Sequence, residues 1–464
     1  MSARTLLQGG WLVTMVPGAE AVRGDLLIDD DRIAAVGRLD DVTDADVVDA
    51  RDRIVLPGLV DTHRHMWQTA LRTIACDWTL GQYFARMRGR LGGVFRPEDT
   101  FAGTMLGMVE ALDSGITTVV DWSHNLNGPD HADAAWDALK RGGGRALFSY
   151  GATNDQALGR DASPHTRDVV RLRKGVGSDD TALVTLGMAV RGPEFSAIDI
   201  CVADWALARE LGLSVTVHVG GGLRGAQGGV AELGARGLLG PDTTYVHCNM
   251  LSDTELDMVA DAGGRASVSP EVEANMGHGP AATARLRSRG IPTGLSADVC
   301  TNVGGDLFGA MRVAIALQRG ADHAAALARG GTLAEVTLTA REVLAMATVD
   351  GARACGLDDR IGTLEVGKQA DVLLLRADTP NLAPMSDPVG AVVHAAGTNN
   401  VESVYVAGRP VKREGRFVAI DVPSVIERAT ASHHYLLGAA GVTDLDWSVP
   451  TLRGRDAILV PATP

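Results

Sequence analysis

The sequence predicts an α/β protein: a (β/α)8 TIM barrel joined to a small β-sandwich domain that both chain ends build. Between residues 54 and 298, eight short runs rich in β-branched residues alternate with longer helical stretches, which is typical of a parallel sheet. These units occupy about 250–300 residues, the size of such a barrel. Strands without intervening helices precede and follow them, and 464 residues exceed the usual ceiling for one hydrophobic core.

We expect the small β domain to comprise residues 1–56 and 362–422, and the barrel to comprise 57–361. Residues 423–464 are expected to form a tail that packs on the rest. This division follows the change from closely spaced strands to alternating strands and helices, and back again.

The elements follow from hydrophobic periodicity and turn signals. Strands of the small domain are expected at 6–15, 25–28, 32–36 and 46–49, and after the barrel at 362–364, 370–375, 401–406 and 409–413. Barrel strands are expected at 54–63, 117–122, 145–150, 183–190, 213–219, 243–247, 265–269 and 292–298. Expected helices include 97–114, 132–142, 198–211, 252–262, 281–289, 333–347 and 351–354.

Composition narrows the class of protein. A hydrophobic fraction of 45% and a charged fraction of 22% are ordinary for a soluble globular protein. No apolar run approaches the ~20 residues of a membrane helix, and the first residues do not resemble a secretory leader. The net charge of −14 disfavours nucleic acid and acidic membranes as partners. Five scattered cysteines without CxxC spacing fit a cytoplasmic protein.

Five residues of metal-ligand type stand at the carboxyl ends of predicted barrel strands. His63 and His65 end the first strand, and residues two apart on a strand share a face. His218, His247 and Asp298 end the fifth, sixth and eighth strands. Each alone is readily explained as a satisfied polar or turn residue. All five at the end where barrels build their active sites predict a metal centre.

The runs PGLVDTHRH, TVHV, YVHC and SADV resemble the signature of the amidohydrolase superfamily, and the flanking segments resemble its small β domain, so the resemblance covers about residues 5–420. The chain is most similar to the branch of cytosine deaminase, S-adenosylhomocysteine deaminase and the triazine hydrolases. The resemblance implies one metal ion held by His63, His65, His218 and Asp298. It implies that His247 contacts the metal-bound water or the substrate.

The resemblance also bears on the number of ions. Binuclear relatives carry a bridging lysine at the end of strand four, whereas this chain has Met188 and Arg191 and no lysine there. We therefore expect one divalent ion. Three histidines and an aspartate suit zinc, with iron or manganese as open alternatives.

Such a site predicts hydrolysis. A bound divalent cation lowers the pKa of its water to ~7, so a metal-bound hydroxide is available at neutral pH. Asp298 can take a proton from that water and pass it to the leaving group, and His247 can stabilise the developing oxyanion. The expected target is the carbon that bears an amino or similar group in an aminopurine, a cytosine-like ring or a triazine.

One position departs from the family pattern. Deaminases of this branch carry a glutamate three residues after the strand-five histidine, where this chain has Gly221. Glu273, or else its neighbour Glu271, is the expected substitute acid, and His278 is a further candidate for substrate contact. The alternative is that both carboxylates are solvated loop residues.

The segment after strand one carries candidate pocket residues. Trp67, Gln68, Trp78 and Tyr83 lie close together in a chain with few aromatics, and Trp67 and Gln68 are the expected substrate contacts. His124, after strand two, is another. Helix packing and a structural hydrogen bond are the competing explanations.

Three functions remain open at this point. The first is a deaminase of a small heterocycle, as above. The second, suggested by Gly221, is a dechlorinating or cyclic-amide-opening hydrolase, or a lyase, of the same superfamily. The third is a non-enzymatic, metal-binding assembly protein. By analogy with relatives we expect a homo-oligomer; the substrate is not specified.

Overall fold

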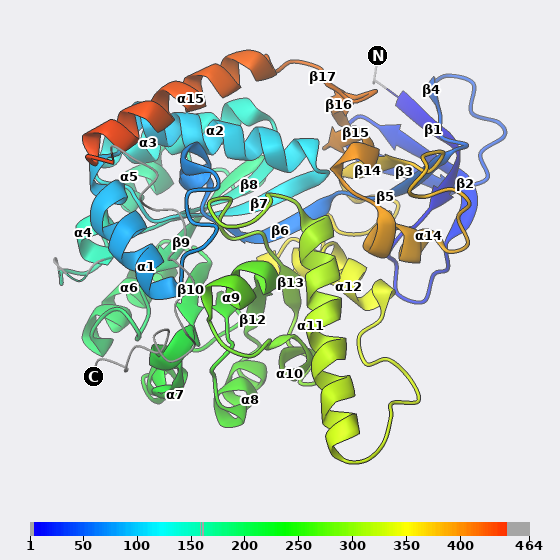
Figure 1. The fold of residues 1–464 in the computed structure, drawn as a ribbon. Coiled ribbons are helices and arrows are strands. Elements are labelled where there is room, and N and C mark those ends of the chain that lie inside the picture. Colours follow the sequence, from blue (N-terminus) through cyan, green and yellow to red (C-terminus); the bar gives the residue numbers. More distant parts are fainter. Residues whose placement is uncertain (1–3, 158, 160–161, 443–464) are drawn as a thin grey trace.

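The computed structural model describes residues 4–157, 159 and 162–442. Its centre is a sheet of eight parallel strands that follow one another in chain order (Figure 1). These strands are β6 (Leu59–Arg64), β7 (Ile116–Ser123), β8 (Arg145–Tyr150), β9 (Val184–Val190), β10 (Val215–Val219), β11 (Thr243–His247), β12 (Arg265–Val268) and β13 (Thr293–Leu295).

The sheet curls into a nearly closed barrel. Beyond the end of β13, the N–H of Asp298 donates to the carbonyl of His63 at 3.1 Å, and the N–H of His65 donates to the carbonyl of Asp298 at 2.9 Å. These two bonds join the last strand to the first, so the predicted barrel is confirmed.

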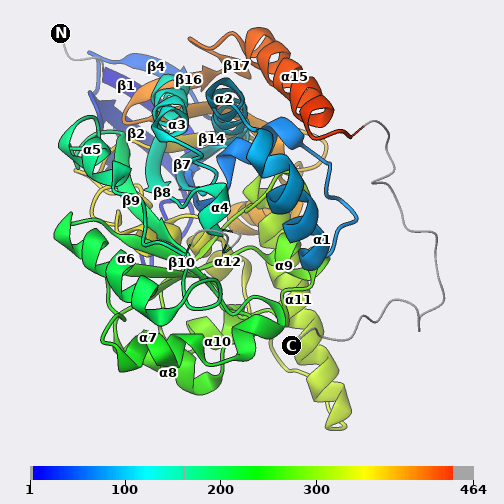
Figure 2. The ribbon, with the colours of Figure 1, turned by 90° about the vertical axis from the view of Figure 1, so that its left-hand side faces the viewer.

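Helices surround the barrel and cover its outer face (Figures 1 and 2). Most of these helices bury an apolar face against the strands, as the 3.6-residue period requires. They are α1 (Leu80–Tyr83), α2 (Pro97–Asp113), α3 (Pro129–Gly142), α4 (Asn154–Ala157), α5 (Asp168–Lys174), α6 (Ile198–Glu210), α7 (Gly229–Ala235), α8 (Asp253–Asp261), α9 (Pro270–Met276), α10 (Thr283–Arg287), α11 (Leu307–Ala328), α12 (Ala340–Met346) and α13 (Val349–Cys355).

Both ends of the chain contribute to a second, mixed sheet beside the barrel. Its order is β17-β16-β15-β14-β5-β1-β2-β3, with β4 paired to β1. The N-terminal part supplies β1 (Arg4–Leu12), β2 (Val22–Asp29), β3 (Arg32–Gly37), β4 (Asp46–Asp49) and β5 (Arg53–Pro57). The C-terminal part supplies β14 (Val372–Arg376), β15 (Val401–Val406), β16 (Arg409–Arg413) and β17 (Arg416–Phe417), with the short α14 (Pro388–Gly390) between β14 and β15.

The single strand expected at 54–63 is two strands, and this expectation was wrong. β5 pairs with β14 of the small sheet, whereas β6 pairs with β7 of the barrel. The break falls at Gly58, where a Cβ would collide with the side chain of Thr117. Glycine therefore lets the backbone pass close to β7 at the point where the chain leaves one sheet for the other.

Two further elements differ from expectation. The helix expected at 333–347 begins only at Ala340, because Thr339 caps it in a capping box with Glu342. Residues 362–364 are not a strand. The last barrel strand is also shorter than the expected 292–298, since it ends at Leu295.

A bidentate ion pair links the barrel to the small sheet. Arg145, at the start of β8, donates to Asp371, just before β14, through Nη2 at 2.9 Å and Nε at 3.1 Å. Both side chains are buried. Asp371 also accepts the N–H of Ala407 at 2.8 Å, so this carboxylate is satisfied from both sides of the interface.

The last described helix, α15 (Val422–Ala439), lies along α2 (Figure 1). Its Leu436 is fully buried in an apolar cluster with Trp67, Tyr83 and Met87, which belong to the segment after β6. Of the predicted tail, residues 443–464 lie outside the described residues. Among the helices that the structure does describe, none is long and apolar enough to cross a bilayer.

Candidate active site and metal centre

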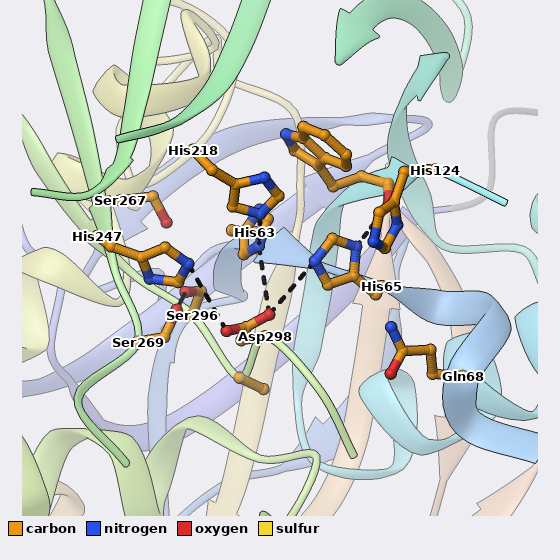
Figure 3. A network of polar contacts seen from close by, with 12 residues as sticks. His63, His65, Gln68, His124, His218, His247, Ser267, Ser269, Ser296 and Asp298 are labelled. Atoms are coloured by element: carbon orange, nitrogen blue, oxygen red, sulfur yellow. Dashed lines mark hydrogen bonds and ion pairs between the residues drawn. The ribbon is translucent and has the colours of Figure 1, made fainter. Parts of the chain in front are cut away.

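The five predicted metal-type residues meet at the carboxyl end of the barrel (Figure 3). His63 lies in β6 and His65 directly follows it, so their side chains share the inward face. His218 lies in β10, His247 ends β11, and Asp298 stands beyond β13. All but His218 are fully or almost fully buried.

The Nε2 atoms of the imidazoles converge on the Asp298 carboxylate. Oδ1 lies 3.3 Å from Nε2 of His63 and 3.5 Å from Nε2 of His65. Nε2 of His218 lies 3.2 Å from Nε2 of His63. Nε2 of His247 is farther out, 3.9 Å from Oδ2. Two sets of ligand atoms each lie within 4.8 Å of one another: His63, His65 and His218, and His63, His247 and Asp298.

The protonation states of these groups suit a divalent cation. Burial lowers the pKa of His63 and His218, and burial together with the neighbouring His63 lowers the pKa of His65 to about 3. Burial alone would raise the pKa of Asp298, but His63, His247 and His65 together lower it. Neutral imidazoles around an ionised carboxylate are the forms that ligate zinc, so the donor set fits such an ion.

A backbone contact orients one of these ligands. Nδ1 of His65 lies 2.7 Å from the carbonyl oxygen of Trp122. A proton on that nitrogen leaves Nε2 with its lone pair free to face Asp298, which is how metal-ligating histidines are usually held.

The backbone is strained where two of the site residues stand. His247, Cys248 and Asp298 have φ of 77°, 62° and 57°, in the left-handed region that residues other than glycine seldom adopt. Such strain concentrates at functional sites, where the surrounding structure holds it in place. Here it turns the side chains of His247 and Asp298 toward each other.

Glu273 of α9 stands behind His247. Its Oε1 lies 3.1 Å from Nδ1 of His247 and accepts the N–H of Ser269 at 2.7 Å, while Oε2 accepts from Nδ2 of Asn249 at 3.2 Å. Burial disfavours the imidazolium of His247, but the bond to Glu273 and the charge of Asp298 outweigh it and raise its pKa. The Glu273 carboxylate therefore faces His247, not open solvent.

The other predicted acid, Glu271, points elsewhere. Its Oε1 lies 2.9 Å from the place where a Cβ on Gly309 of α11 would stand. Burial, with the charge of Asp306, raises its pKa to about 7. The structure thus brings Glu273 to the histidine cluster and places Glu271 against α11. His278 does join the cluster, with its ring centroid 4.6 Å from that of His247.

The predicted substrate contacts form a buried wall beside His65. The His124 ring centroid lies 4.0 Å from that of His65, and Nδ1 of His124 accepts from Nε1 of Trp67 at 3.3 Å. Trp67 and Gln68 have no exposed surface. Nε2 of Gln68 donates to the hydroxyl of Tyr83 at 2.5 Å, and Oε1 of Gln68 has no hydrogen-bond partner. Trp67 thus supports His124, whereas Gln68 keeps an acceptor available.

Sequence reasoning missed two residues of this region. The Trp122 ring centroid lies 4.1 Å from that of His218 and 5.5 Å from that of His65. Its position between Asp121 and His124, at the end of strand two, was the available signal. Glu194 lies in the loop after β9, and its Oε1 accepts the N–H of Gly220 in the loop after β10. Nothing in its local sequence marks this long-range contact.

Comparison with known proteins finds relatives along most of the chain. A 5'-deoxyadenosine deaminase of Methanothermobacter thermautotrophicus is 30% identical over 437 residues, which cover 90% of this chain and 95% of that protein. A 5-methylthioadenosine/S-adenosylhomocysteine deaminase of Desulfitobacterium hafniense is 28% identical over 415 residues, which cover 87% and 91%.

Solved structures share the fold. An adenosine deaminase from Xanthomonas campestris with bound zinc superposes with a TM-score of 0.80 at 24% identity, over 94% of this chain and 99% of that one. An atrazine chlorohydrolase from Arthrobacter aurescens, complexed with zinc, gives 0.81 at 24% identity, over 92% and 100%. The amidohydrolase family model matches residues 54–411, from the strand before Gly58 to the small sheet. The chain therefore belongs to the amidohydrolase family, to which its barrel, its HxH pair and its strand-eight aspartate also point.

Proposed function

We propose that this amidohydrolase is a mononuclear metal-dependent deaminase that replaces the amino group of a small nitrogen heterocycle with oxygen. The observation that carries the proposal is the convergence of three neutral imidazoles and one carboxylate at the carboxyl end of the barrel. The curated relatives are named as deaminases of adenosine-type compounds, and deamination breaks a carbon–nitrogen bond other than a peptide bond.

His63, His65, His218 and Asp298 are the residues that would hold the ion, with zinc as the first choice and iron or manganese as alternatives. When bound, a divalent ion supplies a Lewis acid that makes water a nucleophile at neutral pH. Asp298 takes a proton from the attacking water and passes it to the departing amine. The raised pKa of His247 lets that imidazole donate a hydrogen bond to the oxyanion that forms on the attacked carbon.

Glu273 acts through His247. Its carboxylate is engaged by His247, Ser269 and Asn249 at once, which supports a positioning role over direct proton transfer to substrate. Glu271, Trp67, Gln68, His124 and His278 stay proposed contributors to substrate binding. Of these, Gln68 and His278 each carry a buried polar atom without a hydrogen-bond partner, and such atoms are expected to bond a ligand.

The substrate class that the proposal favours is an aminopurine, with cytosine-like and aminotriazine rings next. The second candidate is hydrolytic displacement of another group, such as chloride, or opening of a cyclic amide; Gly221 favours it, since the usual shuttle glutamate is absent there. A homo-oligomeric state and a cytoplasmic location stay predictions from the sequence.

The test combines metal content with product release. We expect about one divalent ion per purified chain by elemental analysis. We expect ammonia from at least one member of a panel containing adenosine, 5'-deoxyadenosine, 5'-methylthioadenosine, S-adenosylhomocysteine, cytosine and an aminotriazine. A chlorotriazine in the same panel, assayed for chloride, tests the second candidate. A metal-loaded protein that releases no ammonia from any of them would contradict deamination, and a chain that binds no ion would contradict both.

A further inference from the structure

A carboxylate from the loop after β9 reaches into the loop after β10. Glu194 follows the fourth barrel strand, and its Oε1 accepts the N–H of Gly220, two residues beyond the ligand His218. The N–H of Gly221 stabilises the same carboxylate. Backbone groups that follow β10 therefore hold the Glu194 side chain, which follows β9, beside the metal centre. Glu194 is not a member of either set of ligand atoms.

The neighbouring glycine leaves room for it. Gly221 has φ of −86° and ψ of 115°, a conformation that any residue adopts. A Cβ there would lie 3.7 Å from Cδ2 of His278 and 4.0 Å from Oε2 of Glu194, both ordinary contacts. The backbone thus does not require glycine. A side chain at position 221 would project toward the place where the Glu194 carboxylate already stands.

Position 221 lies between Glu194 and the histidines on the strand-six side of the site, and the charge of His247 acts on Glu194. The ring of His278, which a side chain at 221 would touch, is tilted against that of His247, with 4.6 Å between the ring centroids. Burial raises the pKa of Glu194 to about 7, against the opposing effect of the Gly220 and Gly221 N–H groups and of His247. A carboxyl group with such a pKa both accepts and donates a proton near neutrality.

We infer that Glu194 is the proton shuttle of this enzyme and supplies from strand four the carboxylate that related deaminases carry at position 221 on strand five. The inference rests on the proposed deamination. In that reaction the water oxygen adds to the ring carbon that bears the amino group. One water proton goes to Glu194 and then to the adjacent ring nitrogen. The other leaves with the amine, through Asp298, when the carbon–nitrogen bond breaks and ammonia departs.

The first test is Glu194→Gln, which keeps the size of the side chain and an acceptor for the Gly220 N–H. We expect kcat to fall about 100-fold or more, the usual contribution of a general acid–base, with metal content and melting temperature unchanged. The matched control is Glu342→Gln: Glu342 also accepts a backbone N–H, that of Thr339, but in the capping box of α12, outside the site. It should keep wild-type kcat.

The second test moves the carboxylate. Glu194→Ala should be as inactive as Glu194→Gln, and adding Gly221→Glu should restore at least a tenth of wild-type kcat, because the new side chain enters the same space. Full activity in Glu194→Gln, or a double variant no better than Glu194→Ala, would overturn the inference. A loss in Glu194→Gln accompanied by loss of metal would also overturn it, in favour of a structural role. An inactive wild type would instead count against the proposed deamination.

Discussion

At the residue scale, side chains of the centre are paired with groups behind them. Asp298 faces two imidazoles, His65 is tied to the carbonyl of Trp122, and His247 is tied to Glu273. Removing a group that orients a metal ligand or a catalytic residue typically lowers activity or metal affinity about 10–100-fold. Substitutions behind the centre should therefore affect rate more than metal content.

Glu273→Gln tests this separation. The amide oxygen can still accept from Nδ1 of His247 and from the Ser269 N–H, but the amide NH2 now faces the donor Nδ2 of Asn249, and the negative charge that raises the pKa of His247 is gone. His247 therefore loses both its orientation and its proton. We expect kcat to fall about 10–100-fold with metal content and KM nearly unchanged, measured by ammonia release and elemental analysis. Asn249→Ala, which removes only one of the bonds to Glu273, should have a smaller effect. Loss of metal in Glu273→Gln would assign Glu273 to the metal site itself.

Arg64 stands between the two histidines of the HxH pair, and its side chain lies on the opposite face of β6. Its guanidinium points away from the metal centre to Glu110 of α2 and to the carbonyl of Gly305, at 3.0 Å. Arg72 also pairs with Glu110. Burial alone would raise the pKa of Glu110, but Arg64 and Arg72 outweigh it and lower it to about 2 from an ordinary 4.5.

This ion pair predicts a pH-dependent stability. Because the pKa of Glu110 is lower in the folded protein, its stabilisation is complete above pH 4.5 and is lost as the pH falls toward 2. Glu110→Gln should lower the free energy of unfolding by about 2 kcal/mol at pH 7, less than a fully buried pair because the side chain is partly exposed. The difference from wild type should shrink at pH 3. Glu98→Gln, an exposed neighbour on α2, should change little at either pH.

At the scale of elements, strand ends account for what could be predicted. A histidine pair with a spacing of two must share one face of a strand, and parallel strands of a barrel end at one rim, so the convergence of His63, His65, His218, His247 and Asp298 follows from local pattern alone. The Glu194 contact does not, because loop conformation decides it. The break at Gly58 was missed for a similar reason: the apolar run of β5 continues into Leu59 and Val60 of β6, and Thr117, the residue that crowds Gly58, lies far away in the sequence.

The helix α15 gives an element-scale prediction. Leu436 is fully buried against the segment that contains Trp67, whose indole bonds His124. Leu436→Ala should lower the free energy of unfolding by about 2–4 kcal/mol, measured by urea denaturation, and should raise KM by loosening this wall. Ile426→Ala, on the same helix but half exposed, is the matched control and should cost less than about 0.5 kcal/mol. Equal losses would mean that α15 does not brace the site.

At the scale of the whole molecule, polar contacts join the barrel to the small sheet, and among them the Arg145–Asp371 pair is almost fully buried on both sides. The expectation that both chain ends build one β domain came from strand spacing at each end. The pairing of the strands could not be predicted, because it depends on which N-terminal strand lies beside which C-terminal strand. In the structure β5 pairs with β14. Long-range pairing of this kind leaves no local signal.

Breaking the pair should be costly. Asp371→Asn leaves the guanidinium of Arg145 buried without a counter-charge, so the free energy of unfolding should fall by about 3–5 kcal/mol, measured by denaturant titration. Asp378→Asn, which breaks the exposed pair with Arg376, should cost less than about 1 kcal/mol. Replacing both partners, as Arg145→Met with Asp371→Leu, should recover part of the loss. A similar cost for both single variants would mean that solvent reaches the Arg145 site.

The position of β5 also sets an order of events during synthesis. This strand lies in the middle of the small sheet, and its neighbour β14 is translated only after the entire barrel. During translation, the edge of β5 that pairs with β14 therefore stays unpaired until the barrel residues have been synthesised. Unpaired strand edges are sites of wrong association in nascent chains. The first barrel strand continues directly from β5, so the histidine pair it carries is anchored at its leading end only when translation is nearly complete.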